Sequence, residues 1–204
     1  MMAAKKVLFS FEEGDASNKK LLGGKGANLC GMTQIGLPVP PGFVISTEAC
    51  LDYLSSKKKA LKAGVMEQVR SAMVDLEKKT GKGFGSAKNP LLVSVRSGAA
   101  MSMPGMMDTI LNLGLNEETA QGLIKQTKNE RFVYDAYRRL VQLFGTVCMG
   151  IRDEAFDEVF SRIKKERDAE TDIDLDADGL KEATRAFMEV FEKEAGSPFP
   201  QDPY

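Results

Sequence analysis

The stretch Pro90-Leu-Leu-Val-Ser-Val-Arg96-Ser97-Gly98, followed by Ser102-Met103-Pro104-Gly105-Met106-Met107-Asp108, decides how this chain folds and what it binds. Residues 91–95 are short, apolar and rich in β-branched side chains, which predicts a buried strand that ends at Arg96. A guanidinium is permanently charged, and its forked donors match phosphate oxygens. Gly98 and Gly105 leave room for backbone N–H groups to approach an anion closely. The stretch therefore predicts a phosphate site.

A second glycine-rich stretch, Leu21-Leu22-Gly23-Gly24-Lys25-Gly26-Ala27-Asn28-Leu29, places a lysine ahead of residues with helical periodicity. A helix that begins near Lys25 would offer free N–H groups, the positive end of its dipole and an ammonium to the same anion. It is not a P-loop, because Gly26 follows Lys25 where that motif needs Ser or Thr. Alone, the stretch is more typical of a flexible turn than of a phosphate site. Together with Arg96 it predicts that two cations converge on one polyphosphate.

These stretches resemble the pyruvate phosphate dikinase family. The resemblance runs over essentially all 204 residues and includes Gly36-Leu-Pro-Val-Pro-Pro-Gly-Phe43, residues 46–49, residues 93–115, Arg131-Phe-Val-Tyr-Asp-Ala-Tyr-Arg-Arg139 and Pro198-Phe-Pro-Gln-Asp-Pro203. Its most specific part is 102–115. Related phosphoenolpyruvate synthases share Val-Arg-Ser but not Pro-Gly-Met-Met-Asp-Thr-Ile-Leu-Asn-Leu-Gly-Leu.

The sequence pattern predicts an α+β fold. Strands are expected at 7–11 and 43–46, helices at 25–36, 47–53 and 65–78, a turn at 81–85, and only helices after Asn116, at 117–126, 131–149, 153–167 and 180–193. The resemblance implies that residues 1–115 form the first lobe of an ATP-grasp-type nucleotide-binding domain, with a small sheet and helices. Residues 116–197 would form an all-α helical subdomain, and 198–204 an exit segment toward a missing second ATP-binding lobe.

The function that the resemblance implies is phosphoryl transfer from ATP and phosphate to pyruvate, giving AMP, pyrophosphate and phosphoenolpyruvate. Lys25 and Arg96 would be the catalytic cations that hold the ATP phosphates, assisted by amides around Gly98, Ser102 and Gly105. The chain contains no histidine, so the phosphate-accepting histidine is expected on another domain. ATP would bind as Mg-ATP, with the magnesium ligands mainly in the missing lobe and no metal ligand assigned here. A pyruvate and phosphoenolpyruvate barrel would complete a larger enzyme, and the fragment alone is expected to be inactive.

Two other functions stay open. The chain could be a non-catalytic nucleotide-sensing or docking module, or the ATP lobe of a phosphoenolpyruvate synthase-like dikinase. Appearance of phosphate on the histidine domain only when Lys25 is intact would separate catalysis from sensing. Release of pyrophosphate rather than orthophosphate would separate the two dikinases.

The amino-acid composition excludes some classes of binding partner and indicates the cellular compartment. The 28 basic and 29 acidic residues give a net charge of −1, which argues against nucleic acid or an anionic membrane as partner. No apolar run reaches the roughly 18 residues of a membrane helix, and no signal peptide is expected. Three scattered cysteines predict reduced thiols and a reducing compartment, cytoplasmic by expectation, with a plastid or microbody left open. A homo-oligomeric full-length enzyme is compatible with all of this.

Several further features have structural explanations. Asp174-x-Asp176-x-Asp178-Gly179 matches the start of an EF-hand loop, but its twelfth position is Arg185, so a helix cap at Asp176 or Asp178 is expected instead. Arg138 and Arg139 are expected to form salt bridges or to dock a domain. Asp108 is expected to cap the segment after it. The methionines at 101, 103, 106 and 107 are expected to be packing residues or a mobile flap over the nucleotide.

Overall fold

The computed structural model describes residues 5–57, 60–98 and 108–204. The four methionines at 101, 103, 106 and 107 lie outside these residues, as do Ser102 and Gly105. Contacts divide the chain into two compact units, which are described one at a time. Unit 1 is Met1–Gly81 with Ser97–Met107, and unit 2 is Lys82–Arg96 with Asp108–Tyr204.

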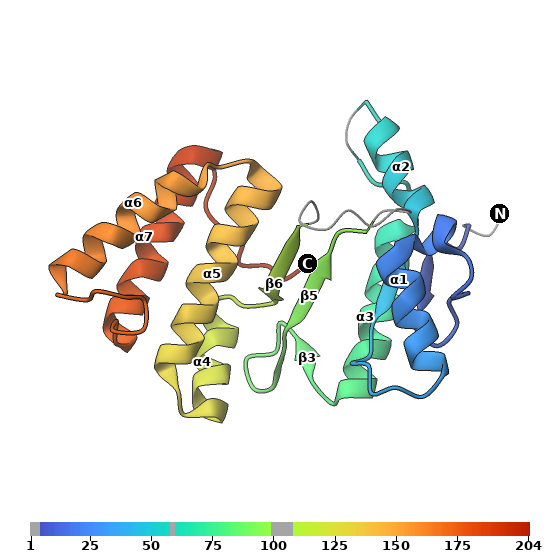
Figure 1. The fold of residues 1–204 in the computed structure, drawn as a ribbon, viewed down its shortest axis with the longest axis horizontal. Coiled ribbons are helices and arrows are strands. Elements are labelled where there is room, and N and C mark those ends of the chain that lie inside the picture. The colour runs from blue at the N-terminus through green and yellow to red at the C-terminus, as the bar shows by residue number, and fades with distance from the viewer. Residues whose placement is uncertain (1–4, 58–59, 99–107) are drawn as a thin grey trace. The chain divides into compact units, whose positions relative to one another are not determined.

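Among its described residues, unit 1 combines a small antiparallel sheet with helices that pack beside it (Figure 1). The strands are β1 (Leu8–Ser10) and β2 (Phe43–Ile45), which pair with Leu8 opposite Ile45. The helices are α1 (Lys19–Gln34), α2 (Thr47–Ser55) and α3 (Val65–Thr80). The expected strands and helices of this region are therefore present, but α1 begins six residues before Lys25. Two small groups of buried side chains hold the unit together: Leu22, Ala27 and Cys30, and Val7, Ala49 and Val65.

Helix α2 begins at Thr47, as expected from the sequence, and is capped by Ser46 directly before it. The hydroxyl of Ser46, not of Thr47, accepts a hydrogen bond from the Ala49 N–H, at 3.4 Å. Ser46 has the extended backbone of a cap residue and is fully buried. Thr47 already lies in the helix, and its hydroxyl donates to the Lys20 carbonyl at 2.6 Å. Through this hydrogen bond, Thr47 connects α2 to α1.

The strands of unit 2 form two separate two-stranded sheets. The first pairs β3 (Gly83–Phe84) with β4 (Pro90–Leu91) in parallel, where the sequence predicted only a turn at 81–85. The second pairs β5 (Val93–Arg96) with β6 (Thr109–Leu113) in antiparallel. The prediction of a single buried strand at 91–95 is wrong for the second half of that range, which is exposed. Leu91 is 6% exposed but Val95 is 49% exposed, because β5 has β6 as its only strand partner among the described residues.

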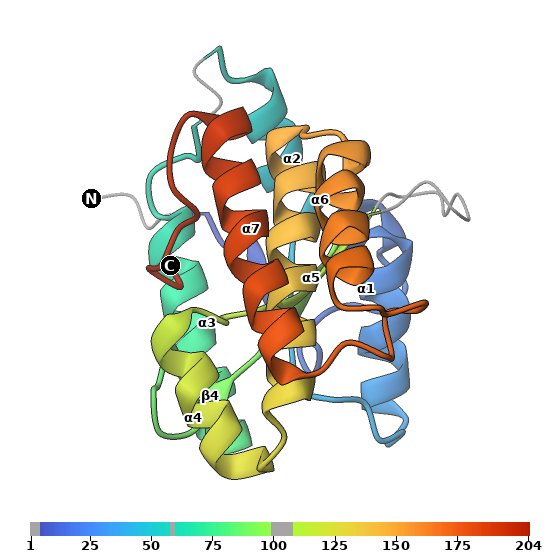
Figure 2. The same cartoon turned by 90° about the vertical axis from the view of Figure 1, so that its left-hand side faces the viewer.

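The rest of unit 2 is helical, as expected from the sequence after Asn116. Its helices are α4 (Glu117–Thr127), α5 (Glu130–Met149), α6 (Asp153–Glu166) and α7 (Ala177–Ala195), and Figure 2 shows the last three side by side. Apolar side chains from all four meet in the largest core of the protein, which includes Ala120, Val133, Tyr137, Leu140, Phe156, Ile163, Leu180, Phe187 and Phe191. Asp176 caps α7 by accepting from the Gly179 N–H at 2.8 Å. The expectation that Asp176 or Asp178 caps a helix, rather than beginning an EF-hand loop, is therefore confirmed for Asp176.

Arg138 is a buried charge within this helical core. Its Nη2 lies 2.7 Å from Asp135 and 3.0 Å from Asp172, and its guanidinium carbon lies 4.1 Å from the ring centre of Phe160. Burial raises the pKa of Asp172, but a hydrogen bond from Lys164 and the charge of Arg138 outweigh it and leave that pKa lowered. The expected salt bridging of Arg138 is confirmed, and Arg139 also pairs with Asp135, at 3.0 Å.

The last seven residues, 198–204, are attached to the helices of unit 2 through Phe199 and Gln201. Phe199 is 8% exposed and makes edge-on contacts with Phe144 and Phe191. The side chain of Gln201 accepts hydrogen bonds from the Glu117 N–H at 3.1 Å and the Tyr137 hydroxyl at 3.3 Å. The role of 198–204 as an exit toward another lobe stays a prediction, but within this chain the segment is firmly attached.

The described residues thus form an α+β structure, with helices and small sheets. The expected domain boundary at 115 stays a prediction, while contacts group β3 to β6 with the helices that follow them. Asp108 directly precedes β6, so the segment that it was expected to cap is a strand, and its role as a cap stays a prediction. Within the described ranges, no helix has both the length and the apolar character that crossing a membrane requires.

Candidate phosphate-binding site

Helix α1 is interrupted at Gly23, two residues before Lys25. Gly23 has φ 69° and ψ 163°, a backbone conformation that essentially only glycine adopts. The first segment of α1 is capped by Asn18, which accepts from the Leu21 N–H at 3.1 Å. A second helical segment begins directly after Gly23, so residues 24–26 form its first turn. The sequence prediction of a helix start near Lys25 therefore describes this second segment.

The break gives the first turn of the second segment the properties of a helix N-terminus. Backbone N–H groups at such a start have no carbonyl one turn earlier in their own segment, and the helix dipole is positive there. Lys25 adds an ammonium at this position, and its side chain is half-buried. A phosphate that approached this turn would meet N–H donors and a point charge together.

Close packing holds this turn against the sheet of unit 1. A side-chain carbon added at Gly26 would lie 2.9 Å from both methyl groups of Val44 in β2, which is closer than real contacts allow. The absence of a side chain at Gly26 therefore lets α1 lie directly on β2. Burial raises the pKa of the thiol of Cys30, which lies further along α1, and keeps it protonated. Cys50 and Cys148 are exposed free thiols.

Arg96 is the last residue of β5, where it pairs with Thr109 of β6. Its side chain is exposed, and Ser97 and Gly98 follow it. A side-chain carbon at Gly98 would meet no atom of the described residues within 4 Å. Ser102 and Gly105, which were expected to add amide donors, lie outside the described residues.

The two predicted cations stand in different units: Lys25 in unit 1 and Arg96 in unit 2. Within the described part of the chain, neither belongs to an ion pair. Their charges are therefore available to a ligand, which buried ion pairs would have prevented. That both reach one triphosphate stays a prediction.

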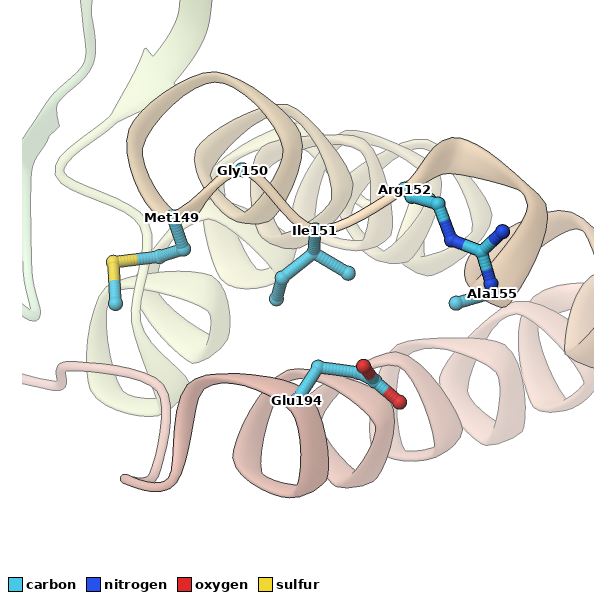
Figure 3. A pocket seen from close by; sticks show the side chains of 6 residues that line it. All are labelled: Met149, Gly150, Ile151, Arg152, Ala155 and Glu194. Carbon is cyan, nitrogen blue, oxygen red and sulfur yellow. The ribbon is translucent and has the colours of Figure 1, made fainter.

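Two hollows occur near the end of α5, apart from these residues. One of about 150 Å³ is lined by Met149, Gly150, Ile151, Arg152, Ala155 and Glu194. Figure 3 shows the Ile151 side chain pointing from the α5–α6 connection toward the α7 helix that carries Glu194. A second hollow of about 500 Å³ shares Ile151 and Arg152 and includes Asp108. Neither includes Lys25 or Arg96, so they are not the predicted phosphate site.

Sequence reasoning missed two features beside the candidate residues. The first is the glycine-only conformation of Gly23, whose signal was the Gly23-Gly24 pair inside a helical pattern. The second is strand β6 with a left-handed residue, Asn112, at φ 59°. Asn-Leu-Gly is typical of such backbone and could have indicated it.

Comparison with known proteins connects this region to nucleotide binding. Residues 19–65 match the family model described as pyruvate phosphate dikinase, AMP/ATP-binding domain. The match begins where α1 begins and ends where α3 begins, so it contains the Gly23 break and Lys25 but not Arg96.

Full-length comparison finds relatives over nearly the whole chain. The chain is 55% identical over 197 residues to pyruvate, phosphate dikinase of Entamoeba histolytica, covering 97% of this chain and 22% of that protein. It is 48% identical over 200 residues to that of Clostridium symbiosum, covering 97% and 23%. It is 46% identical over 207 residues to the chloroplastic pyruvate, phosphate dikinase 1 of Zea mays, covering 100% and 22%.

The chain spans between 21% and 23% of the length of the curated relatives it matches. These matches confirm the resemblance on which the sequence analysis relied: over nearly its whole length, the chain is related to the N-terminal region of the pyruvate phosphate dikinases.

Proposed function

We propose that this chain comprises the first lobe of an ATP-grasp-type domain and a helical subdomain, in a phosphotransferase of the pyruvate phosphate dikinase kind. The complete enzyme would convert ATP, phosphate and pyruvate to AMP, pyrophosphate and phosphoenolpyruvate. The observation that carries the proposal is that the stretch matching an AMP/ATP-binding domain contains a helix start at Lys25, created by Gly23. A helix start with a lysine in its first turn is suited to bind phosphate.

In this proposal, Lys25 and Arg96 each bind and orient phosphate oxygens of ATP. Phosphoryl transfer depends mainly on positioning and on neutralising charge, and fixed cations and amides do both. The N–H groups at 24–26, and those around Gly98, Ser102 and Gly105, would assist. The acceptor is a histidine on another domain, since this chain has none.

The nucleotide would bind as Mg-ATP. Among the described residues, no group of three or more His, Cys, Asp or Glu side chains is arranged to hold a metal ion. Lys25 and Arg96 are donors to phosphate, not metal ligands. We propose that magnesium takes its protein ligands mainly from the second lobe, and that this lobe, a phosphohistidine domain and a barrel for pyruvate are the partners. Some relatives are named chloroplastic; a cytoplasmic location for this protein is our proposal.

Charge removal tests the site. In a protein that retains both ATP-binding lobes, Lys25→Ala and Arg96→Ala should each weaken Mg-ATP binding about ten- to hundredfold, because each loses a charged hydrogen bond. Lys19→Ala, in the first segment of α1, and Arg162→Ala, on an exposed face of α6, are matched controls that should bind normally. Calorimetric titration measures all four. Wild-type affinity in both test variants would refute the assignment.

Two further readouts separate the alternatives. If the chain only senses nucleotide, Lys25→Ala will leave phosphorylation of the histidine domain unchanged while weakening ATP binding. If the enzyme is a phosphoenolpyruvate synthase-like dikinase, product analysis will find orthophosphate in place of pyrophosphate.

A further inference from the structure

Strand β6 contains one residue more than the part of β5 that it faces. Val93 pairs with Leu113 and Val95 pairs with Ile110, so two steps along β5 correspond to three along β6. The irregularity includes Asn112, whose φ of 59° lies in the left-handed region. Asparagine tolerates this conformation far better than most side chains. The pairing is therefore that of a β-bulge, with Asn112 as its left-handed residue.

The helical core of unit 2 explains why the bulge is needed. In a regular strand, residues three apart point to opposite faces. Yet Ile110 is 8% exposed within this core, and Leu113 packs against the same core, while Leu111 between them is 45% exposed. The extra residue brings both side chains to one side. A regular β6 would turn one of them toward solvent.

The chain after the bulge is fixed by close contacts. The Leu115 N–H donates to the Asn112 carbonyl at 3.2 Å. A side-chain carbon at Gly114 would lie 2.8 Å from the Leu91 carbonyl oxygen, and the Thr119 hydroxyl donates to the Gly114 carbonyl at 2.9 Å. This end of β6 cannot slide along its neighbours. The pairing at the other end, where Arg96 faces Thr109, is therefore decided at Asn112.

We propose that Asn112 is a positioning residue for Arg96. Its left-handed backbone fixes the register between β5 and β6 and keeps Arg96 opposite Thr109, where the chain enters the 97–108 connection. A slip of one residue would direct each side chain of one strand to the opposite face. The phosphate part of this inference rests on the proposed function of Arg96, whereas the register part does not.

The test compares three substitutions at Asn112 with one control. Asn112→Gly keeps the left-handed conformation available, Asn112→Ala disfavours it, and Asn112→Val disfavours it most. The control is Lys128→Val, which places the same side chain in a left-handed position, φ 55°, at the end of α4. Both valine variants should lose about five- to thirtyfold in the folding equilibrium constant.

The first readout is the register itself, measured by NMR on this chain. Cross-strand contacts of Arg96 with Thr109, and of Val95 with Ile110, should be lost or moved in Asn112→Val and kept in Asn112→Gly and Lys128→Val. If Asn112→Val does not fold, Asn112→Ala should show the same change in part of the molecules. Unchanged contacts in the folded alanine or valine variant would overturn the inference.

The second readout is Mg-ATP titration in the protein that retains both lobes. Asn112→Val should weaken Mg-ATP binding about tenfold, whereas Asn112→Gly and Lys128→Val should bind like the wild type. The double variant Arg96→Ala/Asn112→Val should bind Mg-ATP no more weakly than Arg96→Ala alone, because both changes act through the same side chain. If Asn112→Val binds Mg-ATP normally while Arg96→Ala binds it weakly, the inference about Asn112 is overturned and the proposed function of Arg96 is not. Normal binding by Arg96→Ala would refute the proposed function of Arg96, and the NMR contacts would still decide the role of Asn112.

Discussion

Replacing Gly23 with alanine should change both the stability of unit 1 and its affinity for nucleotide. Gly23 has φ 69° and ψ 163°, and holding a residue with a side chain there costs about 1–3 kcal/mol. The chain can avoid this cost by continuing α1 as one straight helix, where alanine is favoured over glycine by about 1 kcal/mol. In that case residues 24–26 become the interior of a helix. Their N–H groups then bind carbonyls of the preceding turn.

Losing a helix start that binds an anion costs up to about 2 kcal/mol in partly buried geometry. We therefore expect Gly23→Ala to weaken Mg-ATP binding about tenfold, which corresponds to about 1.4 kcal/mol. The control is Gly36→Ala, at the other end of the same helix. Gly36 also has a positive φ, 82°, and an added side-chain carbon would meet no atom within 4 Å. This variant should lose about 1–2 kcal/mol of stability and keep its nucleotide affinity.

Urea unfolding followed by circular dichroism measures the stability, and calorimetric titration in the protein with both lobes measures the affinity. Carbon chemical shifts at residues 22–26 report whether the break persists. The reasoning fails if Gly23→Ala straightens the helix and still binds Mg-ATP like the wild type, or if Gly36→Ala weakens binding equally.

Three further predictions concern unit 2. Arg138→Ala should cost about 1.5–3 kcal/mol, because it removes a buried guanidinium that pairs with Asp172 and lies on the Phe160 ring, whereas Arg139→Ala, whose side chain is 55% exposed, should cost less than about 1 kcal/mol; equal losses in urea unfolding would contradict this. Phe199→Ala should cost about 3–5 kcal/mol by removing a buried ring that contacts three others; a loss under 1 kcal/mol would mean that the terminal segment contributes little. Burial raises the pKa of Tyr137 to about 12. The folded protein thus keeps a proton that the unfolded chain releases near pH 10, so stability should fall by about 2–3 kcal/mol between pH 10 and 12. Tyr137→Phe, compared by unfolding at several pH values, should lack this part of the fall.

The helices were predictable because their signals are local. Apolar periodicity and the Asp176 cap placed all four helices of unit 2 within three residues of their bounds. The start of α1 at Lys19 was not predictable in this way, because the glycine-rich residues 23–26 have the composition of a turn and conceal a short helical segment before Gly23. Salt bridging by Arg138 could be anticipated, but its partner Asp172 could not, since 34 residues separate them.

The charged residues of the candidate site could be predicted from the sequence, but the strand register that positions one of them could not. Glycines around Lys25, and a strand ending in Arg96, identify the residues with the right charge, and the structure shows where each sits within its unit. The register of β6 was not predictable, because it depends on Ile110 and Leu113 both reaching a helical core formed far along the chain. A bulge of this kind results from packing that local patterns do not contain.

The placement of the three cysteines has a practical consequence. Cys50 on α2 and Cys148 on α5 are exposed, one in each unit, while Cys30 is buried with a raised thiol pKa and should resist modification. A pair of spin labels or fluorophores can therefore be attached to the natural sequence without engineered thiols. Partial desolvation by neighbouring atoms raises the pKa of the otherwise exposed Cys148 thiol, so mildly alkaline conditions should favour its labelling. Dipolar or energy-transfer spectroscopy on that pair would follow how the protein responds to added nucleotide.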